Sequence, residues 1–167
     1  MLALYLRDMN FAYLHLVVNH VPIVGFGFAV VIYFAGLFLR KLDIERTGLV
    51  AFVVCALAAA AAFYTGEPAE EIAEGIPGVS EASIEEHEGW AERAYALAAV
   101  TGVLAALAWT GAVRHPSLKV GLGAAAVATT VAFGITGKEG GEIRHTEFSS
   151  TAAETPTEEA HDEAHDH

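Results

Sequence analysis

Residues 21–39 read "VPIVGFGFAVVIYFAGLFL", an uninterrupted apolar stretch without a charged side chain. A helix rises about 1.5 Å per residue, so about 20 apolar residues cross a hydrocarbon layer that is about 30 Å thick. Three more stretches of this kind lie at 48–66, 94–113 and 118–137, and the only charged side chain among them is Lys119. The sequence therefore predicts an all-α integral membrane protein, built as a four-helix bundle in a lipid bilayer.

Apolar and acidic residues lie in different segments of the chain. The 167 residues are 54% hydrophobic and nevertheless carry a formal net charge of −12, so the acids must lie outside the apolar spans. With 21 Asp and Glu against nine Lys and Arg, the chain offers no basic surface for nucleic acid. We expect an acidic rim on one side of the membrane.

Three of the four predicted helices are expected to project beyond the membrane on the outer side. Residues 11–20 are compatible with a helix, so the first helix is predicted to begin near Asn10, with a bend caused by Pro22. Ser83 and Glu86 fit a capping box, which predicts an early start for the third helix. The fourth helix is predicted to continue past residue 137, through the glycine pair at 140–141.

The connections predict the orientation. Three basic residues lie in the connection 40–47 and two in 114–119, whereas the connection 67–89 has none. Basic loops stay on the cytoplasmic side. We therefore expect a multi-pass protein of the bacterial inner membrane with both termini on the periplasmic side. The first apolar segment is too long for the core of a cleavable signal peptide.

The chain divides into two predicted regions. Residues 1–148 form the four-helix transmembrane domain, which carries the outer-side site. Residues 149–167, "SSTAAETPTEEAHDEAHDH", are polar, acidic and of low complexity. Such a composition cannot bury a core, so this histidine-containing tail is predicted to be disordered.

Histidines are the most informative polar residues near the spans. His15, His20, His87 and His145 all fall at the predicted outer end, and they come from three helices. At 1.5 Å per residue, His20 lies at the membrane boundary, His15 about 7 Å above it, and His87 about 10 Å above the start of its own span. His15 and His20 are about 140° apart around a helix, so they face two different neighbours. Ionisable groups at the membrane boundary favour a functional site.

A layer of this kind suits a b-type haem, which takes two imidazoles on opposite faces of the porphyrin. Four histidines could supply one haem or two. Gly140 and Gly141 would let the backbone approach a flat group closely. Arg144 is expected to pair with a haem propionate, because a guanidinium matches carboxylate geometry.

Two alternatives remain open from the residues alone. One is a non-haem iron, copper or zinc site, which is suggested by the Glu-x-x-His pair of Glu142 and His145. A second pair of this kind is missing, because Ile84 occupies the position three residues before His87. The other is a structural subunit without a ligand. The additional carboxylate ligands for the metal reading are Glu67, Glu70, Glu71, Glu86 and Glu142.

Four strings together carry a resemblance to a known family: "HLVVNHVPI" (15–23), "YTGEPAEE" (64–71), "EEHEGWAER" (85–93) and "GGEIRHTEF" (140–148). They resemble a four-helix bacterial membrane family catalogued as a domain of unknown function, with His-x4-His in its first helix and a Gly-Gly segment leading to a His after its fourth. The match covers most of residues 11–148. Members occur fused to Rieske or c-type cytochrome domains, so the resemblance implies electron transfer and carries over His15, His20, His87 and His145 as haem ligands.

The predicted function is that of a membrane b-type cytochrome with bis-histidine haem near the periplasmic surface. It would transfer electrons between a quinol or donor protein and a periplasmic acceptor, and is expected to be an electron-transfer protein rather than a stand-alone enzyme. The acidic rim would attract a basic cytochrome or a Rieske-type partner. Gly121 and Ala125 form a small-xxx-small pair, which suits the bundle core or a homodimer contact. A homodimer or a place as a subunit of a larger complex is expected.

Overall fold

The computed structural model describes residues 11–111, 115–143 and 145, and every regular element in them is a helix. Four helices are long and apolar enough to cross a membrane: Phe11–Leu39, Leu42–Glu74, Glu81–Trp109 and Pro116–Glu142. The predicted all-α bundle is therefore confirmed. The predicted helix start near Asn10 and the predicted disordered tail lie outside the described residues. The elements are α2 (His20–Leu39), α3 (Leu42–Tyr64), α4 (Gly66–Glu74), α5 (Glu81–Trp109) and α6 (Pro116–Glu142).

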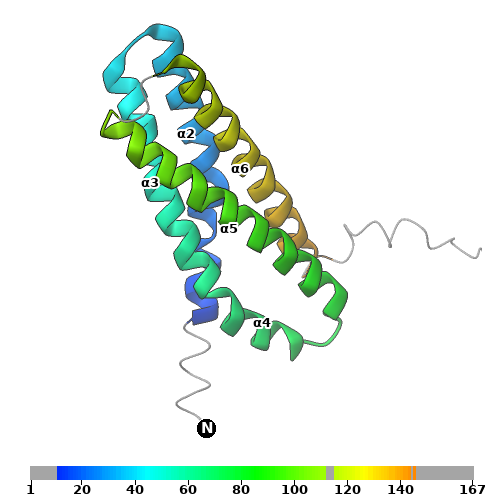
Figure 1. The fold of residues 1–167 in the computed structure, drawn as a ribbon. Helices are drawn as coiled ribbons and strands as arrows, with labels where there is room; N and C mark the ends of the chain where they lie inside the picture. Colours follow the sequence, from blue (N-terminus) through cyan, green and yellow to red (C-terminus); the bar gives the residue numbers. More distant parts are fainter. Residues whose placement is uncertain (1–10, 112–114, 144, 146–167) are drawn as a thin grey trace, which may run out of the picture.

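The four long helices form a ring in chain order. α2 packs against α3 and α6, and α5 packs against the same two helices, so α2 and α5 lie on a diagonal of the bundle. The start of the first helix, α4 and the end of α6 lie together at one end, here called the α4 end (Figure 1). The short α2–α3 and α5–α6 connections lie at the other end. We call it the basic end because it carries Arg40, Lys41, Arg46 and Lys119.

Large apolar side chains cover the outside of the bundle. Phe38 is 88% exposed, and Phe28, Val31 and Leu57 are also largely exposed. A soluble monomer rarely exposes apolar surface on this scale, whereas hydrocarbon is a favourable solvent for it. The exterior thus supports the assignment of the four helices to a bilayer.

The interior is built from a few aromatic rings and many small residues. Phe26 stacks on Phe133 with ring centroids 5.5 Å apart, and on Phe52 at 6.0 Å. Tyr33 packs beside Phe52 and is fully buried. Small side chains complete the core and allow the helices to approach closely: Ala29, Ala59, Ala94, Ala98, Ala105 and Ala126.

The α2–α3 hairpin depends on two glycines. A Cβ atom at Gly36 would overlap the backbone of Glu45, and one at Gly48 would lie 2.7 Å from the Cα of Tyr33. The two helix backbones therefore touch where no side chain intervenes. Across the bundle, Thr101 and Thr129 join α5 to α6 through a buried hydroxyl pair at 2.9 Å.

The helix boundaries correct some predictions in detail. α5 begins at Glu81, so the early start is confirmed. The capping box is wrong, because Ser83 lies inside the helix and the N-cap residue is Ser80. The second span begins at Leu42 rather than 48 and ends at Tyr64, where a turn leads into α4. α6 continues to Glu142, beyond residue 137, as expected.

The first helix is interrupted at one residue close to Pro22, where a bend was predicted; Asn19 keeps helical dihedral angles, and its N–H still donates to the carbonyl of His15. The helical segment 11–18 and α2 are separated by a turn residue, Asn19. Proline lacks an N–H group, so the carbonyl of Val18, four residues before it, has no helical donor. This turn lies at the α4 end, beside the histidines.

Substitution of Gly36 tests the close hairpin. We expect Gly36→Ala to destabilise the protein by about 1–3 kcal/mol, because the added methyl group meets the Glu45 backbone. Gly121→Ala is the matched control, because a Cβ there meets nothing within 4 Å. Thermal unfolding in detergent, followed by circular dichroism, measures both. Equal stability of the two variants would contradict the packing described for α2 and α3.

Candidate functional site: a histidine pair at the α4 end

The structure separates the four predicted histidines into two classes. His15 and His87 are half-buried and bonded to neighbouring helices, whereas His20 and His145 are exposed. His145 lies beyond the end of α6, and its backbone N–H donates to the carbonyl of Gly141. Arg144 lies outside the described residues. The structure thus brings His15 and His87 into the bundle and leaves the other two at its surface.

His15 is bonded to α3 from the N-terminal extension of α2. Its Nδ1 lies 2.9 Å from the carbonyl oxygen of Ala62. The buried hydroxyl of Thr65 lies 3.5 Å from the same nitrogen and donates to the carbonyls of Ala61 and Ala62. Thr65 ends α3 just before Gly66, so the α3–α4 turn shapes one wall around this imidazole.

His87 makes the equivalent bond between α5 and α6. Its Nδ1 lies 3.0 Å from the carbonyl oxygen of Thr136. The ring packs directly against Gly140, where a Cβ atom would lie 2.9 Å from Cε1 of the imidazole. Gly140 therefore makes room for His87 itself. A Cβ at Gly141, by contrast, would meet nothing within 4 Å.

These hydrogen bonds determine the tautomer of each imidazole. A carbonyl oxygen can only accept a hydrogen bond, so Nδ1 carries the proton in both rings. In the neutral ring, Nε2 then keeps its lone pair. Histidines that bind metals are held in this way, with one nitrogen donating to a backbone carbonyl and the other free to coordinate. His20 makes a similar bond, 2.7 Å from the carbonyl of Leu16, but within its own helix and on an exposed face.

The two imidazoles are close enough to influence each other's charge. Burial lowers the pKa of His87, and the positive charge of protonated His15 lowers it further, while the bond to Thr136 and the carboxylate of Glu139 act in the opposite direction. His87 precedes the apolar part of α5 and lies among acids, outside the membrane-spanning segment. The balance favours the neutral form of His87, the form that can coordinate a metal.

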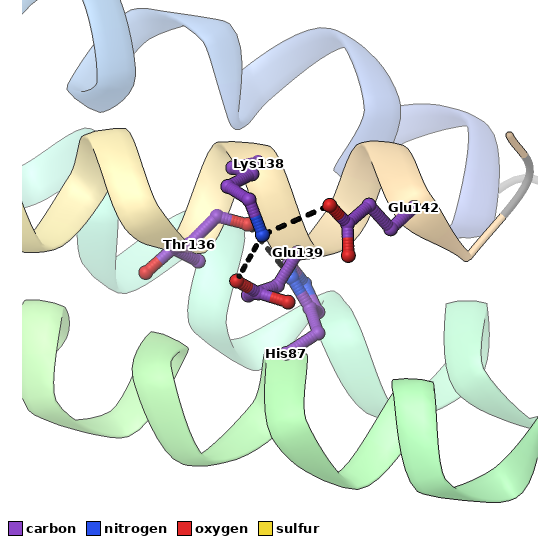
Figure 2. A network of polar contacts seen from close by, with 5 residues as sticks. All are labelled: His87, Thr136, Lys138, Glu139 and Glu142. Carbon is purple, nitrogen blue, oxygen red and sulfur yellow. Dashed lines mark hydrogen bonds and ion pairs between the residues drawn. The ribbon is translucent and has the colours of Figure 1, made fainter. Parts of the chain in front are cut away.

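A buried carboxylate, Glu139, lies beside this pair and was not predicted. Glu139 is only 8% exposed, and its Oε1 lies 3.0 Å from Nζ of Lys138. Glu142 binds the same ammonium group at 2.9 Å, so two carboxylates of α6 converge on one lysine (Figure 2). The sequence could have indicated that Glu139 is buried. It lies on one helical face with residues 129, 132 and 136, at the spacing of three and four residues that is typical of a buried face.

The other predicted carboxylates are dispersed. Glu67, Glu71 and Glu86 are exposed, and Glu70 on α4 is half-buried. Burial and the negative charges of Glu88, Glu74 and Glu67 raise the pKa of Glu70, so α4 and the start of α5 form one acidic surface. Within residues 11–111, 115–143 and 145, no three His, Cys, Asp or Glu side chains come together as a metal-binding group.

Asn19 adds a buried acceptor to this end of the bundle. It lies four residues after His15, hence on the same helical face. Its Oδ1 is buried and has no hydrogen-bond partner among the described residues. A buried acceptor without a donor costs free energy, so this position favours a bound molecule or water that can donate a hydrogen bond.

Together these features define an all-α membrane bundle with two half-buried histidines, each bonded to a backbone carbonyl of a neighbouring helix, at one end. The chain was compared with protein-family models, with curated proteins and with solved structures, and it matches none of them. The family suggested by the sequence strings therefore stays a prediction, and the function must be argued from the site.

Substitution of Gly140 tests the placement of His87. We expect Gly140→Ala to displace the imidazole and break its bond to the Thr136 carbonyl, since the ring has no free space on that side. In ¹⁵N-histidine NMR spectra the wild-type ring should show a protonated Nδ1, and the variant should lose this signature. Gly141→Ala is the matched control and should leave the spectrum unchanged. An unchanged spectrum in both variants would contradict the described contact.

Acid should destabilise the protein through His87. In protein prepared without added haem, the unfolded chain takes up a proton near the ordinary pKa of 6.5, but the folded chain does so only at lower pH. The contribution of His87 to the free energy of unfolding is therefore fully present above pH 6.5. It is lost as the pH falls through the lowered pKa of His87 in the folded protein. Unfolding at pH 7.5 and 5.5 measures the effect, which cannot exceed about 1.4 kcal/mol per pH unit for one histidine.

The controls for this measurement are two glutamine variants. His87→Gln should show a weaker dependence on pH between 7.5 and 5.5, because the titrating group is gone. His20→Gln should retain the wild-type dependence, because His20 is exposed. If His87→Gln keeps the full dependence, other groups are responsible.

Proposed function

We propose that the protein is a membrane electron-transfer protein that binds b-type haem through His15 and His87. The observation that carries this proposal is the shared geometry of the two imidazoles. Each donates Nδ1–H to a carbonyl on a neighbouring helix, and the Nε2 atom of each half-buried ring has no hydrogen-bond partner among the described residues. Because α2 and α5 lie on a diagonal of the bundle, the two helices that carry these rings come from opposite sides of it.

The residues present fit a haem in their donor chemistry. Two neutral imidazoles form the usual ligand pair of a b-type haem, and hydrogen bonds from the outer nitrogens increase the basicity of the coordinating ones. The bound group would supply a one-electron carrier, which the side chains of this chain do not provide. His20 fits this pair less well, since its ring bonds to a carbonyl of its own helix on an exposed face. His145 is exposed and lies beyond the end of α6.

The surrounding residues would orient the ligands and bind the periphery. The carbonyls of Ala62 and Thr136 hold the two rings, and Gly140 gives His87 its place against α6. Lys138, which is exposed and lies two residues before Gly140, is a cation suited to a haem propionate. Its pairs with Glu139 and Glu142 would then be partly exchanged for the propionate.

The proposal places the α4 end on the periplasmic side of a bacterial inner membrane. The basic end would then face the cytoplasm, in agreement with the positive-inside rule. Exposed acids on α4 and α5 give the periplasmic surface a negative potential, which would accelerate the approach of a basic cytochrome or a Rieske-type protein. Quinol or a donor protein would supply the electrons.

An optical spectrum tests the haem. Protein expressed with ample haem and purified in detergent should show a Soret band, and sharp visible bands should appear on reduction with dithionite. We expect His15→Ala and His87→Ala to lose or shift these bands, because each removes one ligand. His20→Ala is the matched control on the same helix and should keep the spectrum.

Two outcomes would overturn the proposal. Absence of a Soret band in well-folded protein would exclude haem, and metal analysis of the same sample would then show whether bare iron, copper or zinc is bound instead. Retention of the wild-type spectrum in both His15→Ala and His87→Ala would assign the ligands to other residues.

A further inference from the structure

The basic end carries more positive than negative side chains. Arg40, Lys41, Arg46 and Lys119 face only Asp43 and Glu45 among the described residues of the α2–α3 connection, the start of α3 and the start of α6. Glu45 is buried and already paired with Lys119. Arg40, Lys41 and Arg46 remain, and Asp43 is the one other acid within residues 40–46. This segment therefore keeps an excess of positive charge.

Arg46 is held in a defined place by an aromatic ring. Its guanidinium lies over the indole of Trp109, with Cζ 5.5 Å from the ring centroid. In the described part of the chain, no carboxylate lies within ion-pair distance of it. A guanidinium stacked on a ring keeps its N–H edge free, and this edge matches the oxygens of a phosphate group.

The surroundings of Arg46 lie where apolar surface meets water. Phe38, Leu39 and Leu42, which flank the basic connection, are 88%, 55% and 53% exposed, and Trp109 is 49% exposed. Tryptophan is enriched at the headgroup level of membranes, with apolar residues on its hydrocarbon side. This combination of exposed apolar side chains and a tryptophan beside Arg46 is the one expected at the headgroup level.

We propose that Arg46, stacked on Trp109, forms a binding site for the phosphate of an anionic phospholipid, together with Arg40 and Lys41. A free phosphate ion carries the same oxygens, but the exposed Phe38 and Leu42 beside the cations favour a ligand with acyl chains. Basic groups next to membrane-spanning helices bind anionic headgroups in this manner. The proposal does not depend on haem and concerns the opposite end of the bundle.

The chain contains a natural control for this site. Arg93 lies over Trp90 with Cζ 5.1 Å from the ring centroid, at the α4 end. Its sequence neighbours include Glu88 and Glu92, so a similar cation–aromatic pair is placed among acids. Arg93→Gln should therefore leave binding of anionic lipid unchanged.

Native mass spectrometry of the full chain in detergent, with equal amounts of phosphatidylglycerol and phosphatidylcholine added, tests the site. The wild type should retain phosphatidylglycerol preferentially. We expect Arg46→Gln to reduce its affinity about fivefold, as one cation near a lipid phosphate contributes that much. Arg46→Lys keeps the positive charge but loses the planar stack on Trp109. Its affinity for phosphatidylglycerol should therefore lie between those of the wild type and Arg46→Gln.

Several results would overturn the proposal. These are equal retention of the two lipids, wild-type affinity in Arg46→Gln or Arg46→Lys, and an equal loss in Arg93→Gln. Displacement of the lipid by millimolar inorganic phosphate would reduce the site to a phosphate-ion site. Circular dichroism and thermal unfolding establish that each variant is folded, and Arg46→Lys remains informative if Arg46→Gln is not.

Discussion

Polar groups inside a membrane bundle must find their partners within the bundle, because hydrocarbon offers none. The rest of this structure depends on that constraint. Thr101 and Thr129 bond to each other between α5 and α6, and Thr136 donates to the carbonyl of Ala132 in its own helix. At the α4 end, beyond the membrane-spanning segments, two half-buried histidines also find their partners within the bundle, in backbone carbonyls of neighbouring helices. The hydrogen bonds that stabilise these helix pairs therefore also orient the imidazoles of the candidate site.

The histidine bonds have two consequences at once. They connect the first helix to α3 and α5 to α6, and they fix the proton on Nδ1. The helices can come close enough for such bonds because small residues line the contacts, as Gly140 does under the His87 ring. Packing and ligand chemistry are therefore coupled: a methyl group added at one glycine would change a helix contact and the orientation of an imidazole together.

The two ends of the bundle have opposite electrostatic character, and the apolar core keeps them apart. The aromatic stack of Phe26, Phe52 and Phe133 lies between the histidine pair and the Glu45–Lys119 pair. Acids dominate the surface of α4 and the start of α5, while cations surround Trp109. One end suits a basic redox partner in the proposed function, and the other suits anionic lipid. This asymmetry also supports a single orientation in the membrane.

The sequence by itself determined the class of the fold. Four apolar stretches of membrane-spanning length predict four helices whatever their neighbours are, since length and hydropathy are local properties. The gathering of histidines at one end followed from topology alone. Tertiary structure decided which of them enter the bundle, because helix rotation and the distance between helices determine whether a ring meets a carbonyl on another helix. His15 and His87 do so, whereas His20 bonds to a carbonyl of its own helix. The burial of Glu139 depends on the same packing.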